Sequence, residues 1–262
     1  MTSRLQLISR IASGGFSTID QARDLDTGAE LAIKRAQAGR ARAEEQLHRE
    51  ARVLARLHHE HIVALHEAAE DAQGPYLALE WIDGEPLAQR IEREPLDAAT
   101  LPEFFVPLLE ALHTVHQAGF AHADVNASNV LIRLDGHLKL IDFGNASALE
   151  ETEVRLMGEP NVGSVHHMAP ELFSAQHPSV RSDLYSVGVM AYHALTRRHP
   201  FEGETPAQVI TAHLRSYYPT LPPSPASGWV QKLLSRDPAS RPASAREALQ
   251  ELVETRRLDG EE

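Results

Sequence analysis

Several common features are missing from this sequence, and each absence narrows what the protein can be. The chain contains no cysteine, which excludes disulfide bonds and cysteine-ligated zinc sites. No segment approaches the length of apolar run that spans a bilayer, and Met1–Gln6 lacks the apolar stretch of a signal peptide. These absences predict a cytoplasmic protein that has no membrane partner.

The charged residues exclude one class of partner and single out three side chains. The formal net charge of −12 argues against non-specific nucleic-acid binding, so we expect no nucleic-acid partner. Arginine is plentiful, whereas only three lysines occur, at Lys34, Lys139 and Lys232. A lysine that is kept in an arginine-rich chain indicates a specific role.

Length and apolar patterning predict a mixed fold. The 262 residues suit one large domain or two lobes that share a cleft. Pro107 is expected to kink the helix that contains it or to end the first part of that helix. Alternating and helical spacings predict strands over 4–11, 30–34, 62–66, 76–82, 130–132 and 138–141, helices over 41–57, 101–117 and 245–256, and a buried helix that begins at Arg181.

Two acids and an amide mark the most informative part of the chain. Asp124 and Asn129 precede the strand at 130–132, and Asp142 follows the strand at 138–141. A tight hairpin of these strands would aim the three side chains at one point. Phosphoryl transfer from a nucleotide needs one carboxylate for the acceptor hydroxyl, and a second carboxylate with an amide oxygen for Mg²⁺. Two acid-bearing surface turns are the alternative interpretation.

These loops resemble the catalytic and metal-binding loops of protein kinases, and further motifs follow in the order of that family. Asp183 matches the helix aspartate that holds the catalytic-loop backbone, although an N-cap role is also compatible with its position. Arg241 is expected to pair with Glu171 as a buried bidentate pair. The motifs are Ala12–Ile19, Glu30–Lys34, Leu57–Val63, Leu79–Gly84, His122–Ile132, Asp142–Gly144, Gly163–Glu171, Arg181–Val189 and Asp237–Pro242.

The resemblance covers essentially the whole chain and is to bacterial Ser/Thr (Hanks-type) protein kinase domains. It implies an α+β, two-lobed fold with a strand-rich N-lobe that has one main helix, and a helical C-lobe. The N-lobe is expected over residues 1–83 and the C-lobe over residues 84–262. ATP and Mg²⁺ are the implied cofactors, with Mn²⁺ as an alternative metal, and the implied partner is a protein substrate with a Ser or Thr acceptor.

The resemblance also implies a role for each site residue. Asp124, Lys34, Glu50 and Asn126 are the expected catalytic residues, and Asn129 and Asp142 are the expected metal ligands. Lys34 would hold the α- and β-phosphates and pair with Glu50. The expected nucleotide-binding residues are Ile11, Ala12, Ser13, Gly14, Gly15, Phe16, Ile19, Ala32, Lys34, Leu79, Glu80, Ile82 and Leu131.

Three positions depart from the family pattern. Ala123 replaces the arginine that binds a phosphorylated activation loop, so we expect activity that does not depend on that phosphorylation. Alanine substitutions at Ser147, Thr152 and Ser164 would test this expectation. Asn126 replaces a lysine that touches the γ-phosphate, although Asn126 could still donate a hydrogen bond. Ala12 replaces the first glycine of the phosphate loop, and its methyl group predicts a modest loss of nucleotide affinity at most.

Two other functions are compatible with these residues. A pseudokinase, acting as a nucleotide-binding or scaffolding module, would bind nucleotide or none and would not turn it over. A small-molecule kinase of the aminoglycoside or choline type uses a similar His-x-Asp loop, but Ala169-Pro170-Glu171, Gly163-Ser164 and Arg241 favour a protein-substrate groove. We find no sensor domain in this sequence, so we expect that a partner protein could supply the signal that regulates activity.

Overall fold

A computed structural model describes residues 4–37, 39–151, 165–215, 220–221 and 223–259, with side chains to residue 255. Thr152, Gly163 and Ser164 therefore lie outside the described residues. The helices are α1 (Ala41–Leu54), α2 (Leu87–Arg93), α3 (Leu101–Gln117), α5 (Val180–Thr196), α6 (Pro206–Arg215), α7 (Pro225–Leu233) and α8 (Ala245–Asp259). The strands are β1 (Leu5–Ser13), β2 (Ser17–Asp24), β3 (Glu30–Ala36), β4 (Leu65–Asp71), β5 (Gly74–Glu80), β6 (Gly84–Pro86), β7 (Phe120–Ala121), β8 (Val130–Arg133), β9 (Leu138–Leu140) and β10 (Ser147–Ala148).

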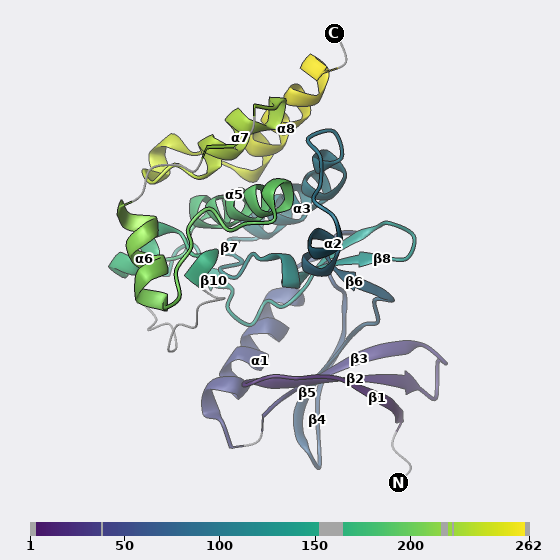
Figure 1. The fold of residues 1–262 in the computed structure, drawn as a ribbon. Coiled ribbons are helices and arrows are strands. Elements are labelled where there is room, and N and C mark those ends of the chain that lie inside the picture. Colours follow the sequence, from purple (N-terminus) through teal and green to yellow (C-terminus); the bar gives the residue numbers. More distant parts are fainter. Residues whose placement is uncertain (1–3, 38, 152–164, 216–219, 222, 260–262) are drawn as a thin grey trace.

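The N-terminal part is an antiparallel sheet with one helix against it, as the two-lobed kinase-like fold predicts. The strand order is β1-β2-β3-β5-β4, and α1 lies between this sheet and the helical part of the molecule (Figure 1). Alternation along β3 decides the two faces of the sheet, because successive side chains point to opposite sides. Leu31 and Ile33 pack with Ala22 and Ala78 in a small cluster on one face, which leaves Lys34 on the other face, towards α1.

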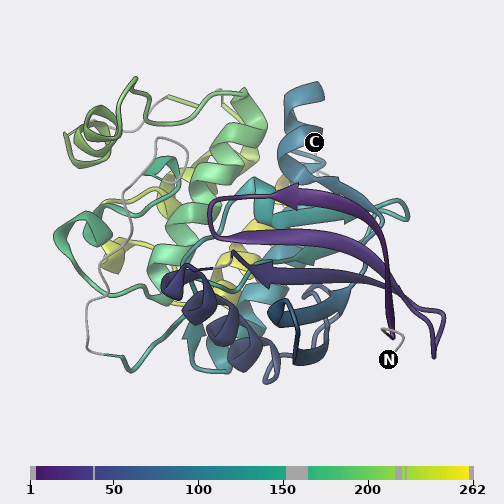
Figure 2. The same cartoon turned by 90° about the horizontal axis from the view of Figure 1, so that it is seen from below.

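The C-terminal part is helical and is organised around α3 and α5. Seen from below, the strands of the sheet cross in front of these helices (Figure 2). Phe105 on α3 is fully buried and meets Trp229 on α7 edge to face, with ring centroids 6.1 Å apart. Gly188 on α5 is needed for this packing, because an added Cβ would lie 2.7 Å from Leu233 Cβ.

A small sheet connects the two parts. Its order is β6-β8-β9, and β8 and β9 form the antiparallel hairpin that the sequence predicts around the two acidic loops. Gly84 in β6 approaches β8 so closely that an added Cβ would lie 2.1 Å from the backbone oxygen of Ile132. Only glycine fits at this position, so the chain crosses from one part to the other at a fixed point.

Several predicted boundaries were wrong. The strand predicted at 62–66 begins at Leu65, because Ile62 instead forms a bridge with Leu140 of β9. The strand predicted at 76–82 lies two residues earlier, at Gly74–Glu80. The helix predicted to Leu57 ends at Leu54, and the last helix runs on to Asp259.

One of the remaining helices has its predicted bounds, and another begins one residue before its predicted start. The helix that contains Pro107 continues through it from Leu101 to Gln117, so the proline does not end its first part. The helix expected to begin at Arg181 begins one residue earlier, at Val180, after the capping residue Ser179. Within the described ranges, no helix has both the length and the apolar character that crossing a bilayer requires.

Candidate active site

The loop that carries Asp124 is held from behind by a buried carboxylate on α5. The backbone N–H of His122 donates to Asp183 Oδ2 at 2.8 Å, and that of Ala123 donates to Oδ1 at 2.9 Å. His116 Nε2 on α3 lies 2.9 Å from Asp183 Oδ2. Ala123 has a left-handed φ of 61°, which non-glycine residues rarely adopt, so these bonds hold a strained backbone in place.

His122 links this loop to the segment that carries Asp142. Its buried ring meets Phe143 edge to face with centroids 4.7 Å apart, and Nε2 lies 3.2 Å from the backbone oxygen of Ile141. Phe143 is itself fully buried in the core. Between Ile141 and Phe143, Asp142 adopts a left-handed φ of 62°. The burial of Phe143 and the contact of His122 with the Ile141 carbonyl therefore hold the backbone on both sides of Asp142.

Two amides orient the carboxylate of Asp124. Asn126 Nδ2 donates to Oδ1 and Asn145 Nδ2 donates to Oδ2, each at 3.1 Å. Burial raises the pKa of Asp124 above its ordinary value, and the nearby Asp142 adds to the rise, whereas the two amides oppose it. A carboxylate with a raised pKa and a fixed orientation is suited to accept a proton from a hydroxyl group.

Asn126 is used within the loop itself. Its Oδ1 accepts from the backbone N–H groups of Ser128 and Asn129 at 2.9 and 3.2 Å, which caps the 3₁₀ helix Ala127–Asn129. Its Nδ2 donates to the backbone oxygen of Asp124 at 3.0 Å as well as to the carboxylate. The expected donor for a phosphate is thus already engaged, because Asn126 supports Asp124 instead.

The two predicted metal ligands present oxygen atoms. Asn129 Nδ2 donates to the backbone oxygen of Asp124 at 2.9 Å, so its side-chain carbonyl is the end of the amide that a cation would meet. Asp142 Oδ1 accepts from the backbone of Gly144 at 3.2 Å and lies 3.0 Å from Lys34 Nζ, which leaves Oδ2 for a cation. Carboxylate and amide oxygens are the ligands that Mg²⁺ prefers, so this donor set fits that ion.

Lys34 lies between two carboxylates. Its Nζ is 2.6 Å from Glu50 Oε2 on α1 and 3.0 Å from Asp142 Oδ1, so the expected pair with Glu50 is present. Burial disfavours the charged lysine, but these two carboxylates outweigh burial and raise its pKa above the usual range. Burial raises the pKa of Glu50, although the charge of Lys34 opposes this rise. Burial would also raise the pKa of Asp142, but Lys34 outweighs burial there and the pKa of Asp142 is lowered.

The glycine-rich turn between β1 and β2 is shaped for an approaching ligand. Gly14 and Gly15 have ordinary φ values, and an added Cβ would meet no atom within 3.8 Å at Gly14 and none within 4 Å at Gly15. The fold itself therefore does not require glycine here, whereas a phosphate close to the backbone would. Gln37 ties the turn to the end of β3, because its Nε2 donates to Gly14 O at 2.7 Å.

Strand register places most of the predicted nucleotide-binding side chains on one face of the sheet. Ala12 lies opposite Ile19, Ile19 lies opposite Lys34, and Ala32 lies opposite Leu79. Directly opposed residues share a face, so these residues lie on the same face of the sheet as Lys34. Ser13 is an exposed residue at the end of β1, and Ile11 lies at an irregularity in the pairing of β1 with β2.

The segment after β5 supplies the remaining predicted contacts. The backbone N–H of Glu80 donates to Ala64 O at 2.9 Å, so this donor is already used within the fold. The Glu80 carboxylate pairs with Lys139 Nζ at 2.8 Å. Ile82 is buried, and Leu131 lies half-buried on β8.

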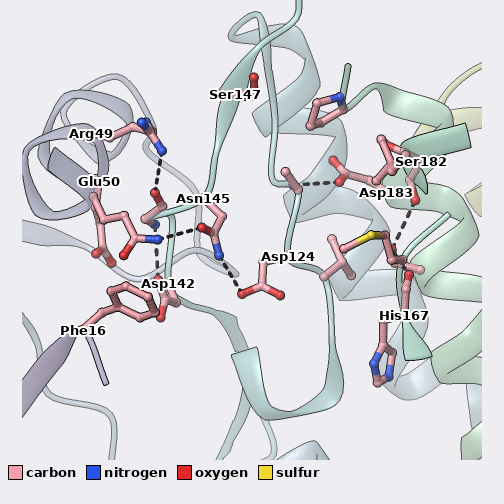
Figure 3. A pocket seen from close by; sticks show the side chains of 18 of the residues that line it. Phe16, Arg49, Glu50, Asp124, Asp142, Asn145, Ser147, His167, Ser182 and Asp183 are labelled. Carbon is pink, nitrogen blue, oxygen red and sulfur yellow. Dashed lines mark hydrogen bonds between the residues drawn. The ribbon is translucent and has the colours of Figure 1, made fainter. Parts of the chain in front are cut away.

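One cleft of about 1160 Å³ brings the reactive side chains together. Figure 3 shows Asp124, Asp142 and Glu50 around it, with Phe16 beside them. The cation-π contact between Arg42 on α1 and the Phe16 ring, 5.8 Å from the centroid, draws the turn towards α1. Of the predicted site residues, the cleft is lined by Gly14, Gly15, Phe16, Lys34, Glu50, Asp124 and Asp142.

A second buried ion pair lies away from this cleft. Arg241 NH1 and NH2 donate to the two oxygens of Glu171 at 2.6 and 2.8 Å, as the sequence predicts. The remaining guanidinium hydrogens go to the backbone oxygens of Arg181, Ser235 and Arg236. All five donors of an arginine are therefore used, which closes this pair to any further ligand.

Three residues that bond to the side chains or loops of the site were not predicted from the sequence. For a fourth, Asp183, the N-cap role that the sequence also allowed was wrong. Asn145 and Gln46 reach the cleft as single polar residues without a motif, and His116 lies in a helix that reads as apolar core. Asp183 is not the N-cap of its helix, because Ser179 caps it in a reciprocal pair with Ser182. A buried polar residue in an apolar helix, such as His116, was the only available signal.

Comparison with known proteins agrees with this geometry. The model of the protein kinase domain matches residues 5–253. A probable serine/threonine-protein kinase of Streptomyces coelicolor is 32% identical over 93% of this chain, which spans 38% of that protein. The serine/threonine-protein kinase PknL of Mycobacterium tuberculosis is 34% identical over 84% of this chain and 56% of its own length. PknB of Mycobacterium leprae is 29% identical over 97% of this chain and 43% of its own length. The chain thus spans about two fifths to just over half of these relatives.

Proposed function

The chain belongs to the protein kinase family, and we propose that it transfers the γ-phosphoryl group of ATP to serine or threonine hydroxyl groups of proteins. The observation that carries this proposal is the position of Lys34 between Glu50 and Asp142, beside a cleft that Asp124 also lines. An ammonium has three donors, and in the part of the chain that the structure describes two of them face these carboxylates. The third donor of Lys34 remains for a phosphate oxygen.

Lys34, Glu50 and Asp124 each have a role in this reaction. Lys34 neutralises phosphate charge, and Glu50 keeps it in place from α1. Asp124 orients the acceptor hydroxyl and takes its proton, which its raised pKa favours. The turn at Gly14 offers backbone N–H groups to the phosphates. Hydrophobic residues of the sheet face and Leu131 enclose the adenine ring.

Asn129 and Asp142 would hold the metal ion. Mg²⁺ would neutralise charge on the phosphates when it is bound. The two residues contribute an amide oxygen and a carboxylate oxygen from adjacent ends of the β8-β9 hairpin. Because Lys34 lowers the pKa of Asp142, that carboxylate is ionised at neutral pH and ready to bind a cation.

We propose that activity does not require phosphorylation of the activation segment. The methyl group of Ala123 cannot bind a phosphate, and the backbone N–H of this residue is already bonded to Asp183. The link between Lys34 and Glu50 is likewise made without one. Ser147 is buried in β10, which makes it a poor acceptor site. Substituting Ser147 or Thr152 by alanine is expected to leave activity within about twofold, and a larger loss in either variant would contradict independence.

The crossing at Gly84 supports a boundary between the lobes. Residues 1–83 would form the N-lobe and residues 84–262 the C-lobe, because β6 pairs with β8 directly after the chain leaves β5. This division places Lys34 and Glu50 in one lobe and Asp124, Asn129 and Asp142 in the other. The reaction would therefore take place where the lobes meet.

Intact-mass measurement tests the function directly. The protein is incubated with Mg²⁺ and ATP, alone and with casein as a protein acceptor, and Asp142→Asn is run alongside. We expect phosphate on the chain or on casein, and its loss in the variant, because the variant lacks the charge that binds the metal. A chain that transfers no phosphate to either protein would contradict the proposal, in favour of a pseudokinase or a small-molecule kinase. Transfer of a nucleotide in place of phosphate would reverse the assigned orientation of ATP.

A further inference from the structure

We propose that Asn145 is a positioning residue, which couples the placement of α1 to the orientation of the catalytic carboxylate through Gln46. This inference rests on the proposed function, because it assigns Asn145 a part in the same phosphoryl transfer. Asn145 directly follows Asp142-Phe143-Gly144, at a place where the sequence shows only a polar residue.

The side-chain amide of Asn145 bridges two elements that are distant in sequence. Gln46 Nε2 on α1 donates to Asn145 Oδ1 at 2.9 Å. Asn145 Nδ2 donates in turn to Asp124 Oδ2 at 3.1 Å. An amide is planar and has an acceptor at one end and donors at the other, so one group can serve both contacts at once. Figure 3 shows Asn145 between the residues of α1 and Asp124.

Neighbouring contacts make this segment follow α1. Arg49 NH1 donates to the backbone oxygen of Gly144 at 3.1 Å, and the backbone N–H of Phe143 donates to Glu50 Oε1 at 3.4 Å. Three consecutive residues, 143–145, therefore each contact α1. Phe143 also meets the ring of His122 in the catalytic loop, but among these three residues it is Asn145 whose side chain donates to the Asp124 carboxylate. A displacement of α1 would thus reach Asp124 through this residue.

The bond to Asn145 also decides which way the carboxylate faces. Asn126 holds Oδ1 of Asp124 and Asn145 holds Oδ2, so rotation of the carboxylate would break both bonds. Each carboxylate oxygen has a further lone pair, which leaves room for the hydroxyl of a substrate. The same helix carries Glu50, so a position of α1 that forms the Lys34 pair also orients Asp124. Ala123 replaces the arginine that would bind a phosphorylated activation loop. In this chain the relay provides a link between α1 and the catalytic loop that does not need that arginine.

Three substitutions separate the two halves of the relay. Asn145→Leu has nearly the same shape and removes both bonds. Asn145→Asp keeps the acceptor for Gln46 but places a second carboxylate against Asp124. Gln46→Met removes only the donor on α1. Because Asn145 and Gln46 contact each other at the surface, all three variants are expected to fold, with a Tm within about 2 °C of the wild type.

The test measures kcat and the KM for ATP with casein as acceptor. A hydrogen bond to a charged group supports an expected fall in kcat of about tenfold for Asn145→Leu, with the KM for ATP within about twofold. Asn145→Asp is expected to be slower still, because like charges repel. Gln46→Met should lower kcat about threefold. The double variant that combines Gln46→Met with Asn145→Leu should be no slower than Asn145→Leu alone, because both substitutions interrupt the same relay. Gln231→Met, on the exposed face of α7, is the matched control and should keep the wild-type kcat.

The outcomes distinguish the relay from the function on which it rests. If the wild-type chain transfers no phosphate, the proposed function and the relay both fail. If the wild type is active and Asn145→Leu keeps its kcat, the relay alone is wrong. Losses that multiply in the double variant would also overturn it, because independent sites do not share one path. A rise in KM with an unchanged kcat would make Asn145 a binding residue and would equally contradict the positioning role.

Discussion

Two buried ion pairs in this molecule use different cations and leave different chemistry behind. In the cleft, Lys34 Nζ faces Glu50 and Asp142 at 2.6 and 3.0 Å. In the C-terminal part, Arg241 donates two hydrogen bonds to the Glu171 carboxylate and three more to backbone oxygens. The arginine is saturated, whereas the lysine faces two carboxylates among the residues that the structure describes and keeps one donor for a ligand. An arginine whose donors are all used is suited to hold the fold, whereas a lysine with a remaining donor is suited to bind a ligand.

The largest expected effect comes from removing the unsaturated cation. Lys34→Met should reduce phosphate transfer by about a thousandfold, the cost of losing one preorganised donor to a transition state. The fold should survive, because Glu50, whose pKa burial already raises, can take up a proton when its partner is lost. Intact-mass kinetics and thermal unfolding check this prediction together. A variant that unfolds rather than loses activity would make Lys34 a structural residue like Arg241.

Removing the saturated cation should instead cost stability. Arg241→Ala leaves Glu171 buried without its partner, which is expected to lower the free energy of unfolding by about 3–5 kcal/mol. Urea denaturation measures this loss. Arg23→Ala is the control, since its pair with Glu30 is exposed and should contribute less than about 1 kcal/mol. Equal effects in the two variants would contradict the role of burial and saturation.

Lys139 offers an intermediate case that sharpens the comparison. Its Nζ lies 2.8 Å from Glu80 Oε2, and the side chains are 12% and 18% exposed. Lys139→Met is expected to lower the free energy of unfolding by about 1 kcal/mol, between the exposed pair and the saturated one. The urea midpoint of this variant, compared with those of Arg23→Ala and Arg241→Ala, checks the order. A loss as large as that of Arg241→Ala would show that saturation does not decide the cost.

The smallest effect concerns a neutral group that lies near neither pair. His199 stacks between His166 and His193, with ring centroids 4.1 and 4.5 Å away, and burial with these two neighbours lowers its pKa to about 4. The unfolded chain has a histidine pKa near about 6.5, so it binds a proton that the folded chain excludes. Stability should therefore fall as the pH decreases from about 6.5 towards 4.

His199→Phe tests this pH dependence. Phenylalanine keeps the stacked ring but cannot bind a proton, so the urea midpoint of the variant should fall less than that of the wild type between pH 7 and pH 5. Part of the dependence should persist, because burial also lowers the pKa of His193. Identical slopes for the two proteins would show that His199 does not contribute.

The sequence was sufficient for features that rest on local pattern. Alternating apolar residues predicted the β8-β9 hairpin. The pair between Arg241 and Glu171, 70 positions apart, was predicted instead from the spacing of the family motifs. The strand predicted at 62–66 failed because Ile62 forms a bridge with Leu140. Such a partner, 78 positions away, leaves no periodic trace at Ile62.

The relay through Asn145 was invisible for the same reason. Its partner Gln46 lies 99 positions away, and each residue alone reads as a solvated amide. Asn126 shows the converse problem, because its residue type suggested a free donor that the loop in fact uses for itself. Side-chain partners depend on the assembled fold, which residue identity does not specify.

The scarcity of lysine makes this chain suitable for amine chemistry. Lys139 is tied to Glu80 and Lys232 to Glu251, while Lys34 alone among the three lines the cleft. An acylating reagent that is carried on a nucleotide would therefore mark a single side chain, and peptide mapping would report occupancy of the cleft without any acceptor. A labelled position other than 34 would reveal a second place where nucleotide binds.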